Sequence, residues 1–195
     1  MVLPVDVQSG EDIVKEFVTS SSSVTVPSGE LWLVNAFAGN TNDSNGESAL
    51  TVNGEAAAGY DQSQGATSSF KTTMLLDEGD TVEAFKDFDY DVVLLGYDIS
   101  GVIDNEVNTF QLGVGESVTV PSGEDWMIYC SSGSSNDSDE AWMEVDDTAA
   151  LGTFDPDGST LGTLQFNVQT VLPSGTKLTM RDDGELGAHI GYIVI

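Results

Sequence analysis

The chain has 195 residues, of which 33 are acidic and 5 basic, so its formal net charge at pH 7 is -28. With 39% hydrophobic residues, a chain of this length can bury the core of one or two domains, which excludes a disordered acidic tail. Five basic residues are too few to neutralise a row of phosphates or to bind an anionic lipid surface, so neither nucleic acid nor a membrane is expected as a partner.

The high acidity predicts a salt-rich environment. At this net charge, self-repulsion strains the compact state in dilute buffer. Molar salt reduces the Debye length to about 3 Å and removes most of that repulsion. Acidic residues scattered along the whole chain, with few lysines, are typical of proteins from salt-in halophiles, above all haloarchaea. An ordinary acidic mesophilic protein is the alternative, but such chains usually gather their charges into runs. We therefore expect a halophilic protein.

The chain contains an internal duplication. The segment 24–30, Val-Thr-Val-Pro-Ser-Gly-Glu, recurs letter for letter at 118–124. The match continues with Trp32 and Trp126, and ends with the pairs 96–97 and 191–192, both Gly-Tyr. A register kept over this length, with slips of only one residue, does not arise by chance. The sequence predicts two copies of one module, residues 1–100 and 101–195.

Each copy is predicted to be all-β. Short runs of β-branched and aromatic residues alternate with clusters of Gly, Ser, Asn, Asp and Pro, and no segment has a sustained helical period. The predicted strands of the first copy are 12–19, 22–26, 31–38, 48–53, 68–76, 80–86 and 90–99. Those of the second copy are 106–112, 116–120, 125–131, 141–146, 163–171, 176–181 and 187–195. About seven strands per module suit a small β-sandwich or jelly roll.

The strand that begins near the repeated tryptophan has two apolar faces in the first copy. Trp32, Val34 and Ala36 form the face that we assign to the core. The opposite face is too apolar for water, and its residues are Leu31, Leu33, Asn35 and Phe37. The sister module, another subunit or a peptide is expected to cover it. In the subunit case, Leu31, Leu33 and Phe37 form the oligomer interface.

Two further features of the strands lead to predictions. Segments 92–95 and 189–195 are apolar enough to be buried on both faces of a sheet. The second module is more polar on its outer face, at Asp125 and Tyr129, and is expected to project outward or to meet a host surface.

No arrangement of residues predicts catalysis. His189 is the single histidine, and we expect it to be a packing or interface residue. Cys130 is the single cysteine, so no internal disulfide forms, and we expect a small buried hydrophobe with no basic neighbour to lower its pKa. With 33 carboxylates, a close pair of them would not identify a glycosidase. The protein is not expected to be an enzyme.

No cofactor is predicted, although three Asp-rich turns have ligands for a hard cation such as Ca²⁺ or Mg²⁺. They are residues 87–91, 136–140 and 155–159. The last of them is too short for a Ca²⁺-binding EF-hand loop and lacks its closing Glu, and hydrated salt cations around solvated carboxylates are the simpler interpretation of all three.

The motif Val-Thr-Val-Pro-Ser-Gly-Glu-x-Trp-x-Val, followed by Leu-x-x-Gly and Gly-Tyr, resembles the small β-sandwich modules of virion proteins, which occur in tailed-phage fibres and head decorations. Together with the halophilic composition, this resemblance implies a capsid decoration or turret protein of a haloarchaeal virus. It would assemble with itself around a symmetry axis and bind other virion proteins, and a host cell surface is a further partner.

The N-terminal residues 1–7 lack the basic start and apolar core of a signal peptide, and no apolar run approaches the length of a membrane span. The expected location is therefore the virion, after synthesis in the host cytoplasm. Two alternatives stay open. One is a small jelly-roll capsid protein. The other is a fibre-type module that binds carbohydrate or a host receptor through an aromatic platform, for which Tyr60, Trp142 and Phe154 are the candidates.

Overall fold

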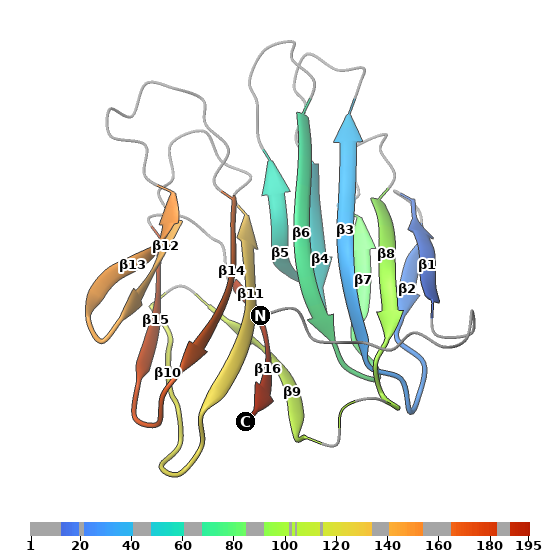
Figure 1. Ribbon diagram of the computed structural model, residues 1–195. Helices are drawn as coiled ribbons and strands as arrows, with labels where there is room; N and C mark the ends of the chain where they lie inside the picture. Colours follow the sequence, from blue (N-terminus) through green and yellow to red (C-terminus); the bar gives the residue numbers. More distant parts are fainter. Residues whose placement is uncertain are drawn as a thin grey trace, which may run out of the picture.

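The computed structural model describes residues 13–19, 22–40, 48–60, 68–84, 92–101, 103, 105–113, 115–133, 141–153, 165–182 and 188–195. These residues form 16 β-strands in four antiparallel sheets of four strands each (Figure 1). The prediction of an all-β chain made of two small sandwich modules is confirmed.

The first eight strands are β1 (Ile13–Val18), β2 (Ser23–Thr25), β3 (Trp32–Asn40), β4 (Ser48–Val52), β5 (Glu55–Tyr60), β6 (Ser68–Leu76), β7 (Thr81–Ala84) and β8 (Val92–Asp98). The second eight are β9 (Val107–Leu112), β10 (Ser117–Thr119), β11 (Trp126–Gly133), β12 (Ala141–Val145), β13 (Thr148–Thr153), β14 (Gln165–Leu172), β15 (Lys177–Asp182) and β16 (Ala188–Val194).

The two halves of the chain share one topology. The sheets of the first half have the strand orders β1-β8-β3-β6 and β2-β7-β4-β5. Counted from its own first strand, the second half repeats both orders, as β9-β16-β11-β14 and β10-β15-β12-β13. Two four-stranded antiparallel sheets linked in this order are a jelly roll. Each module is therefore an eight-stranded jelly roll, and none of the four described sheets takes strands from both halves.

The duplicated sequence forms duplicated local structure. In the first module the chain turns at Pro27–Glu30, where the Glu30 amide donates to the Pro27 carbonyl at 3.2 Å and Gly29 has a φ of 85°. Glu30 then accepts the indole N–H of Trp32 at 2.7 Å. The second module repeats the interaction between Glu124 and Trp126 at 2.8 Å. In both copies the motif Glu-x-Trp therefore provides a carboxylate acceptor for a largely buried indole N–H.

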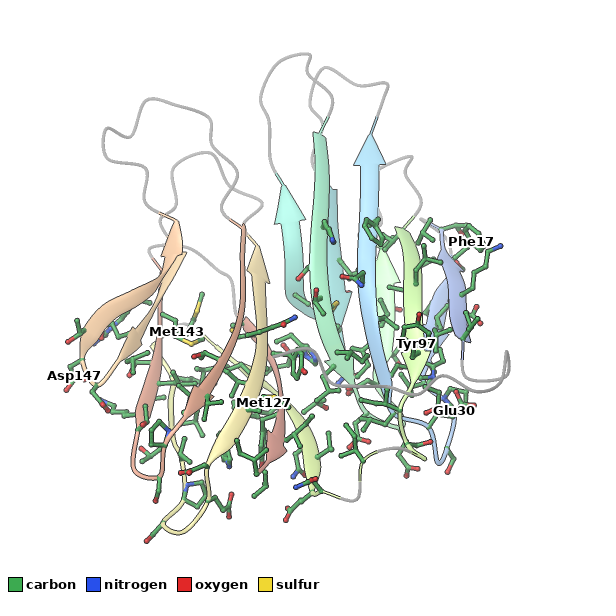
Figure 2. All side chains as sticks on the ribbon, viewed as in Figure 1. Phe17, Glu30, Tyr97, Met127, Met143 and Asp147 are labelled. Atoms are coloured by element: carbon green, nitrogen blue, oxygen red, sulfur yellow. The ribbon has the colours of Figure 1, made fainter. Side chains whose placement is uncertain are left out.

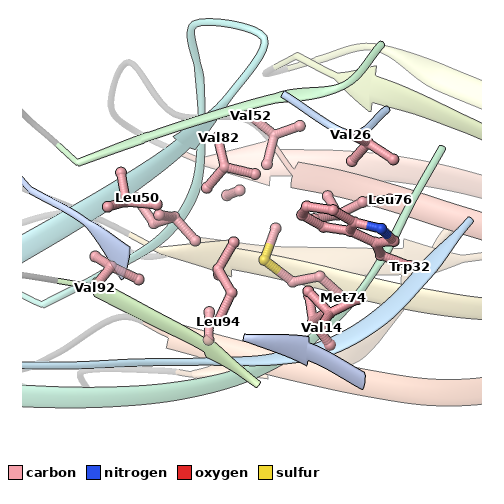
Figure 3. Close-up of a cluster of buried hydrophobic side chains, with 14 of the residues drawn as sticks. Val14, Val26, Trp32, Leu50, Val52, Met74, Leu76, Val82, Val92 and Leu94 are labelled. Carbon is pink, nitrogen blue, oxygen red and sulfur yellow. The ribbon is translucent and has the colours of Figure 1, made fainter. Parts of the chain in front are cut away.

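Each module has its own core between its two sheets. In the first module, Trp32, Met74 and Leu94 of one sheet face Leu50 and Val82 of the other (Figure 3). In the second module, Trp126 stacks on Tyr192, with ring centroids 3.9 Å apart. The core face assigned to the tryptophan strand is therefore correct, and Cys130 is fully buried on it as predicted.

Strands β5 and β13 were not predicted. Both are rich in alanine and glycine, which disfavour strands, and both pair with the preceding strand through a two-residue turn. The turn residues Asn53 and Gly54 both have positive φ, as do Asp146 and Asp147. The dipeptide Asn-Gly is a strong hairpin signal and was available in the sequence.

The two Gly-Tyr pairs, which match in sequence, are not equivalent in the structure. Tyr97 pairs with Leu33, whereas Tyr192 pairs with Ile128, which lies one position further along the equivalent strand. Because side chains alternate along a strand, this slip places the two tyrosines on opposite faces of their sheets. Tyr192 packs into the core, and Tyr97 points outward.

Candidate interaction surface

On the outer side of the sheet β1-β8-β3-β6, the first module has an apolar face that the described residues leave largely exposed over β1 and β8. Its outward positions alternate with the core positions of the same strands. Ile13 and Phe17 of β1, with Leu95 and Tyr97 of β8, are exposed by between 40% and 56%. Figure 2 labels Phe17 and Tyr97 on these two strands. The prediction that both faces of segment 92–95 are buried is therefore wrong, because nothing in the described chain covers Leu95.

A groove of about 540 Å³ crosses this face. Its lining residues are Ile13, Val14, Leu33, Asn35, Thr73, Leu95, Gly96, Tyr97 and, from the second module, Gln169. The polar groups in the groove are two amides, one hydroxyl and the phenol of Tyr97. Thr73 donates its hydroxyl to the side-chain oxygen of Asn35 at 2.9 Å.

The charge on this face differs from that of the chain as a whole. The outward positions of its four strands, from β1 to β6 across the sheet, carry no acidic side chain between residues 13–17, 93–97, 33–37 and 71–75. Two of the five basic residues lie on it. Lys15 sits over the ring of Phe17 and Lys71 over the ring of Phe37, each 5.6 Å from the centroid. In a chain of charge -28, this surface is apolar and weakly basic.

The equivalent face of the second module is covered by the first module. A third cluster of buried residues lies between the modules: Leu31, Leu75 and Ile99 from the first, and Tyr129 and Ile193 from the second. Leu33 and Met127 pack against it. We expected the sister module, another subunit or a peptide to cover the face at Leu31 and Leu33. In this chain the sister module covers it.

Polar contacts between the modules surround His189, which is completely buried. Its Nε2 lies 2.9 Å from the carbonyl oxygen of Leu75, which can only accept, so Nε2 carries the proton. Its Nδ1 accepts from the side-chain amide of Gln111 at 2.9 Å. The same amide nitrogen donates to the carbonyl oxygen of Val52 at 3.2 Å. The prediction that His189 is a packing or interface residue is confirmed.

Burial lowers the pKa of His189 below its ordinary value of 6.5, although the hydrogen bond to Leu75 and the negative charge of Asp80 act in the opposite direction. A proton on Nδ1 would face the donor hydrogens of the Gln111 amide. The interface therefore requires the neutral imidazole. Burial also raises the pKa of the Cys130 thiol, which keeps it protonated and unreactive.

A second polar contact between the modules is centred on Asp80, which is also buried. Its Oδ2 accepts from the hydroxyl of Thr109 in the second module and from the amide N–H of Asp77, both at 2.9 Å. Its Oδ1 accepts from the side-chain amide of Asn53 at 2.7 Å. Three donors therefore satisfy one buried carboxylate.

The predicted interface residues have different surroundings. Leu31 is buried between the modules, so it is not on a surface that another subunit could reach. Leu33 belongs both to the intermodule contact and to the lining of the groove, while Phe37 is half-buried under Lys71. We predicted that the outer face of the second module projects outward at Asp125 and Tyr129. For Tyr129 this prediction is wrong, because the first module buries this residue.

The large apolar residues that are exposed on this face were not predicted to be exposed; they are Ile13, Phe17, Leu95 and Tyr97. The alternation of Ile13, Lys15 and Phe17 with Val14 and Val18 was the available signal, since it gives β1 two apolar faces.

Several predicted sites lie outside the described residues. Phe154 is not described, and the side chains of Tyr60 and Trp142 are not described although their backbones lie in β5 and β12. The Asp-rich turns 87–91, 136–140 and 155–159 are also outside the described part. Among the residues that are described, no helix is long and apolar enough to cross a membrane.

Comparison with known proteins does not assign a family. No family model and no curated protein matches the chain. Among solved structures, the tandem CBM22-1–CBM22-2 domain of Paenibacillus barcinonensis Xyn10C is 7% identical, with a TM-score of 0.23, and the match covers 95% of this chain and 93% of that one. A variant of oxalate decarboxylase from Bacillus subtilis is 12% identical, with a TM-score of 0.20, and the match covers 94% of this chain and 68% of that one. These scores are too low to support an argument about fold or function.

Proposed function

We propose that this chain is a structural assembly protein of a haloarchaeal virus, a capsid decoration or turret component that associates with itself around a symmetry axis. The observation that carries the proposal is the apolar face of the first module, which among the described residues is exposed over β1 and β8 and has no acidic side chain at its outward positions. A row of large apolar side chains on a soluble protein marks a contact surface. Jelly rolls also recur in viral capsids, although lectin domains and cupins share them.

The charge distribution supports assembly in brine. Copies that each carry a charge of -28 repel one another in dilute buffer. In molar salt the Debye length of about 3 Å leaves only charges in direct contact to interact. The described outward residues of the apolar face include no acidic side chain to desolvate, so burying them between subunits is favourable once the long-range repulsion is screened.

The test is the absolute mass in solution, measured by light scattering after size exclusion at molar and at low salt. A closed oligomer in molar salt is expected, and it should dissociate on dilution of the salt. Phe17→Asp places a charge on the exposed face without touching a core, and should reduce the mass to that of the monomer. A monomer in both salts would overturn the proposal.

The chain could also assemble as a small jelly-roll capsid protein, which builds the viral shell itself. The product of assembly distinguishes such a shell protein from a decoration or turret component. A shell protein should form closed particles or sheets visible by electron microscopy in molar salt, whereas a decoration or turret component should stop at a small ring.

The second candidate is a module that binds carbohydrate or a host receptor, and the groove supports it. The ring of Tyr97 lines the groove together with the amides of Asn35 and Gln169 and the hydroxyl of Thr73, which are groups suited to stacking on and hydrogen-bonding a sugar. Calorimetric titration with a panel of oligosaccharides tests it. Binding that Tyr97→Ala abolishes, in a protein that stays monomeric, would favour this candidate.

A further inference from the structure

Each module carries the same two surfaces, one around Leu75 or its equivalent Val171, and one around Ile193 or its equivalent Tyr97. Within the chain, only one surface of each type is buried in the contact between the modules. Strand pairing defines the equivalence. Leu75 pairs with Leu33 in the first module as Val171 pairs with Met127 in the second. Tyr97 pairs with Leu33 as Ile193 pairs with Met127.

One surface of each type is buried in the contact between the two modules of the chain. Leu75, on β6 of the first module, is fully buried against Ile193 of the second module, in a cluster to which Val107 also contributes. The contact joins the β5-β6 edge of the first module to the outer face of the sheet β9-β16-β11-β14 of the second. It is not reciprocal, because an edge of a module and the outer face of its sheet are different surfaces.

The remaining surface of each type is exposed. Val171, the equivalent of Leu75, is 47% exposed on β14. Tyr97 and Ile13, the equivalents of Ile193 and Val107, lie on the open face that contains the groove. The chain therefore presents one exposed surface of each type, and both border the groove that Tyr97 and Gln169 of β14 line together.

We propose that these two surfaces bind each other between copies of the chain, so that the β14 side around Val171 of one copy docks on the face around Tyr97 of the next. This inference rests on the proposed self-assembly and specifies its partner surfaces. A contact between two different surfaces is heterologous, so it builds a closed ring where the rotation permits and an open filament where it does not.

Two observations define this contact further. The described outward residues of the receiving face include no acidic one and include Lys15 and Lys71, so this face suits a strongly acidic partner. The contact is not an identical copy of the internal one. Where the second module has Gly191 beneath Leu75, the first module has Leu95, whose side chain occupies that space. The docked copy sits further from the sheet, and we expect the contact to open at low salt while the internal one persists.

Chemical cross-linking tests the pairing of surfaces. Tyr97→Cys and Val171→Cys are made separately in the full chain and treated in molar salt with a short bismaleimide. The native Cys130 is buried and does not interfere. A mixture of the two variants should give a linked dimer that neither variant gives alone, and the double variant should give a ladder of multimers. Ser117→Cys, on the exposed edge strand β10, is the control and should not link to Tyr97→Cys.

The outcomes separate this inference from the proposed function. Parent protein that is an oligomer by light scattering, with Tyr97→Cys linking to itself, would mean a reciprocal face-to-face contact and would overturn the docking while self-assembly stands. An oligomer in which Val171→Cys forms no cross-link would also overturn the docking and leave self-assembly standing. Parent protein that is a monomer in molar salt would overturn both.

Discussion

The imidazole of His189 and the backbone carbonyl of Leu75 are joined by a 2.9 Å hydrogen bond that connects the last strand of the second module to a strand of the first. Both residues are fully buried, so the bond is shielded from water. The two jelly rolls are therefore held together by a buried, partly polar contact, and its polar groups can be tested one at a time.

The stability of the protein should fall as the pH drops below the ordinary histidine pKa. Since burial lowers the pKa of His189, the unfolded chain binds a proton below about pH 6.5 while the folded chain stays neutral. Stability from this group is complete above that pH and is lost as the pH falls, by at most about 1.4 kcal/mol near pH 5.5. Urea unfolding in molar salt at the two pH values measures it.

His189→Gln is the control for this pH effect, because its amide can still donate to the carbonyl oxygen of Leu75. The many carboxylates contribute the same pH dependence to both proteins. The variant should lose less stability than the parent between pH 8 and about pH 5.5. Equal losses would mean that His189 is not held neutral.

Gly191→Ala should loosen the contact between the modules. A Cβ on Gly191 would lie 2.5 Å from the Cβ of Leu75 and 2.9 Å from its carbonyl oxygen, and no side chain can yield by that amount without moving a strand. The expected cost is about 1–3 kcal/mol in the free energy of unfolding. Gly101→Ala, where a Cβ meets nothing within 4 Å, is the matched control and should change stability by less than about 0.5 kcal/mol.

Asp80→Asn should destabilise the protein although it removes a negative charge. The carboxylate accepts from Asn53, Asp77 and Thr109, and an amide in its place turns one acceptor into a donor that faces another donor. The expected cost is about 1–3 kcal/mol. Glu83→Gln removes a charge from the neighbouring strand without entering this network. If both variants were equally stable, the loss of one negative charge, and not the loss of hydrogen bonds, would account for the change in the free energy of unfolding.

The two tyrosines of the Gly-Tyr pairs should respond differently to the same truncation. Tyr192→Ala removes a ring stacked on Trp126 and should cost about 2 kcal/mol or more. Tyr97→Ala removes a side chain that is exposed on the open face, and should cost less than about 0.5 kcal/mol in the monomer. Thermal unfolding of both variants at low protein concentration measures the contrast, and equal losses would contradict the slip in register.

Potassium chloride should raise the free energy of unfolding, because it screens the repulsion within a chain of charge -28. Most of the gain is expected as the salt rises from about 0.1 M to about 1 M, where the Debye length falls from about 10 Å to about 3 Å. Sucrose, which acts by exclusion from the surface, is the uncharged control. An equal gain in sucrose would mean that screening is not the cause.

Much of the fold could be predicted because its signals are local. Pro27 and Gly29 specify a turn through their own backbone preferences, and the alternation of Trp32 and Val34 with outward residues identifies a strand and its core face. The strand Glu55–Tyr60 was not predicted because its alanines and glycine disfavour strands, so the only local signal for it was the hairpin turn at Asn53 and Gly54.

The interaction surface could not be predicted in the same way. Leu33 and Leu95 have similar chemistry in the sequence, yet one contacts the second module and the other is exposed. The difference depends on where one sheet lies against another, which no short segment specifies.

The sequence by itself therefore determined the duplication, the all-β modules and the core face of the tryptophan strands, because each of these follows from residue type and spacing within one strand or turn. Only the tertiary structure decided that Tyr192 is internal while Tyr97 is exposed, that His189 joins the modules, and that Leu95 on the face of the first module is exposed. These features depend on strand register and on contacts between residues far apart in the chain, where a shift of one residue reverses which side chains are buried.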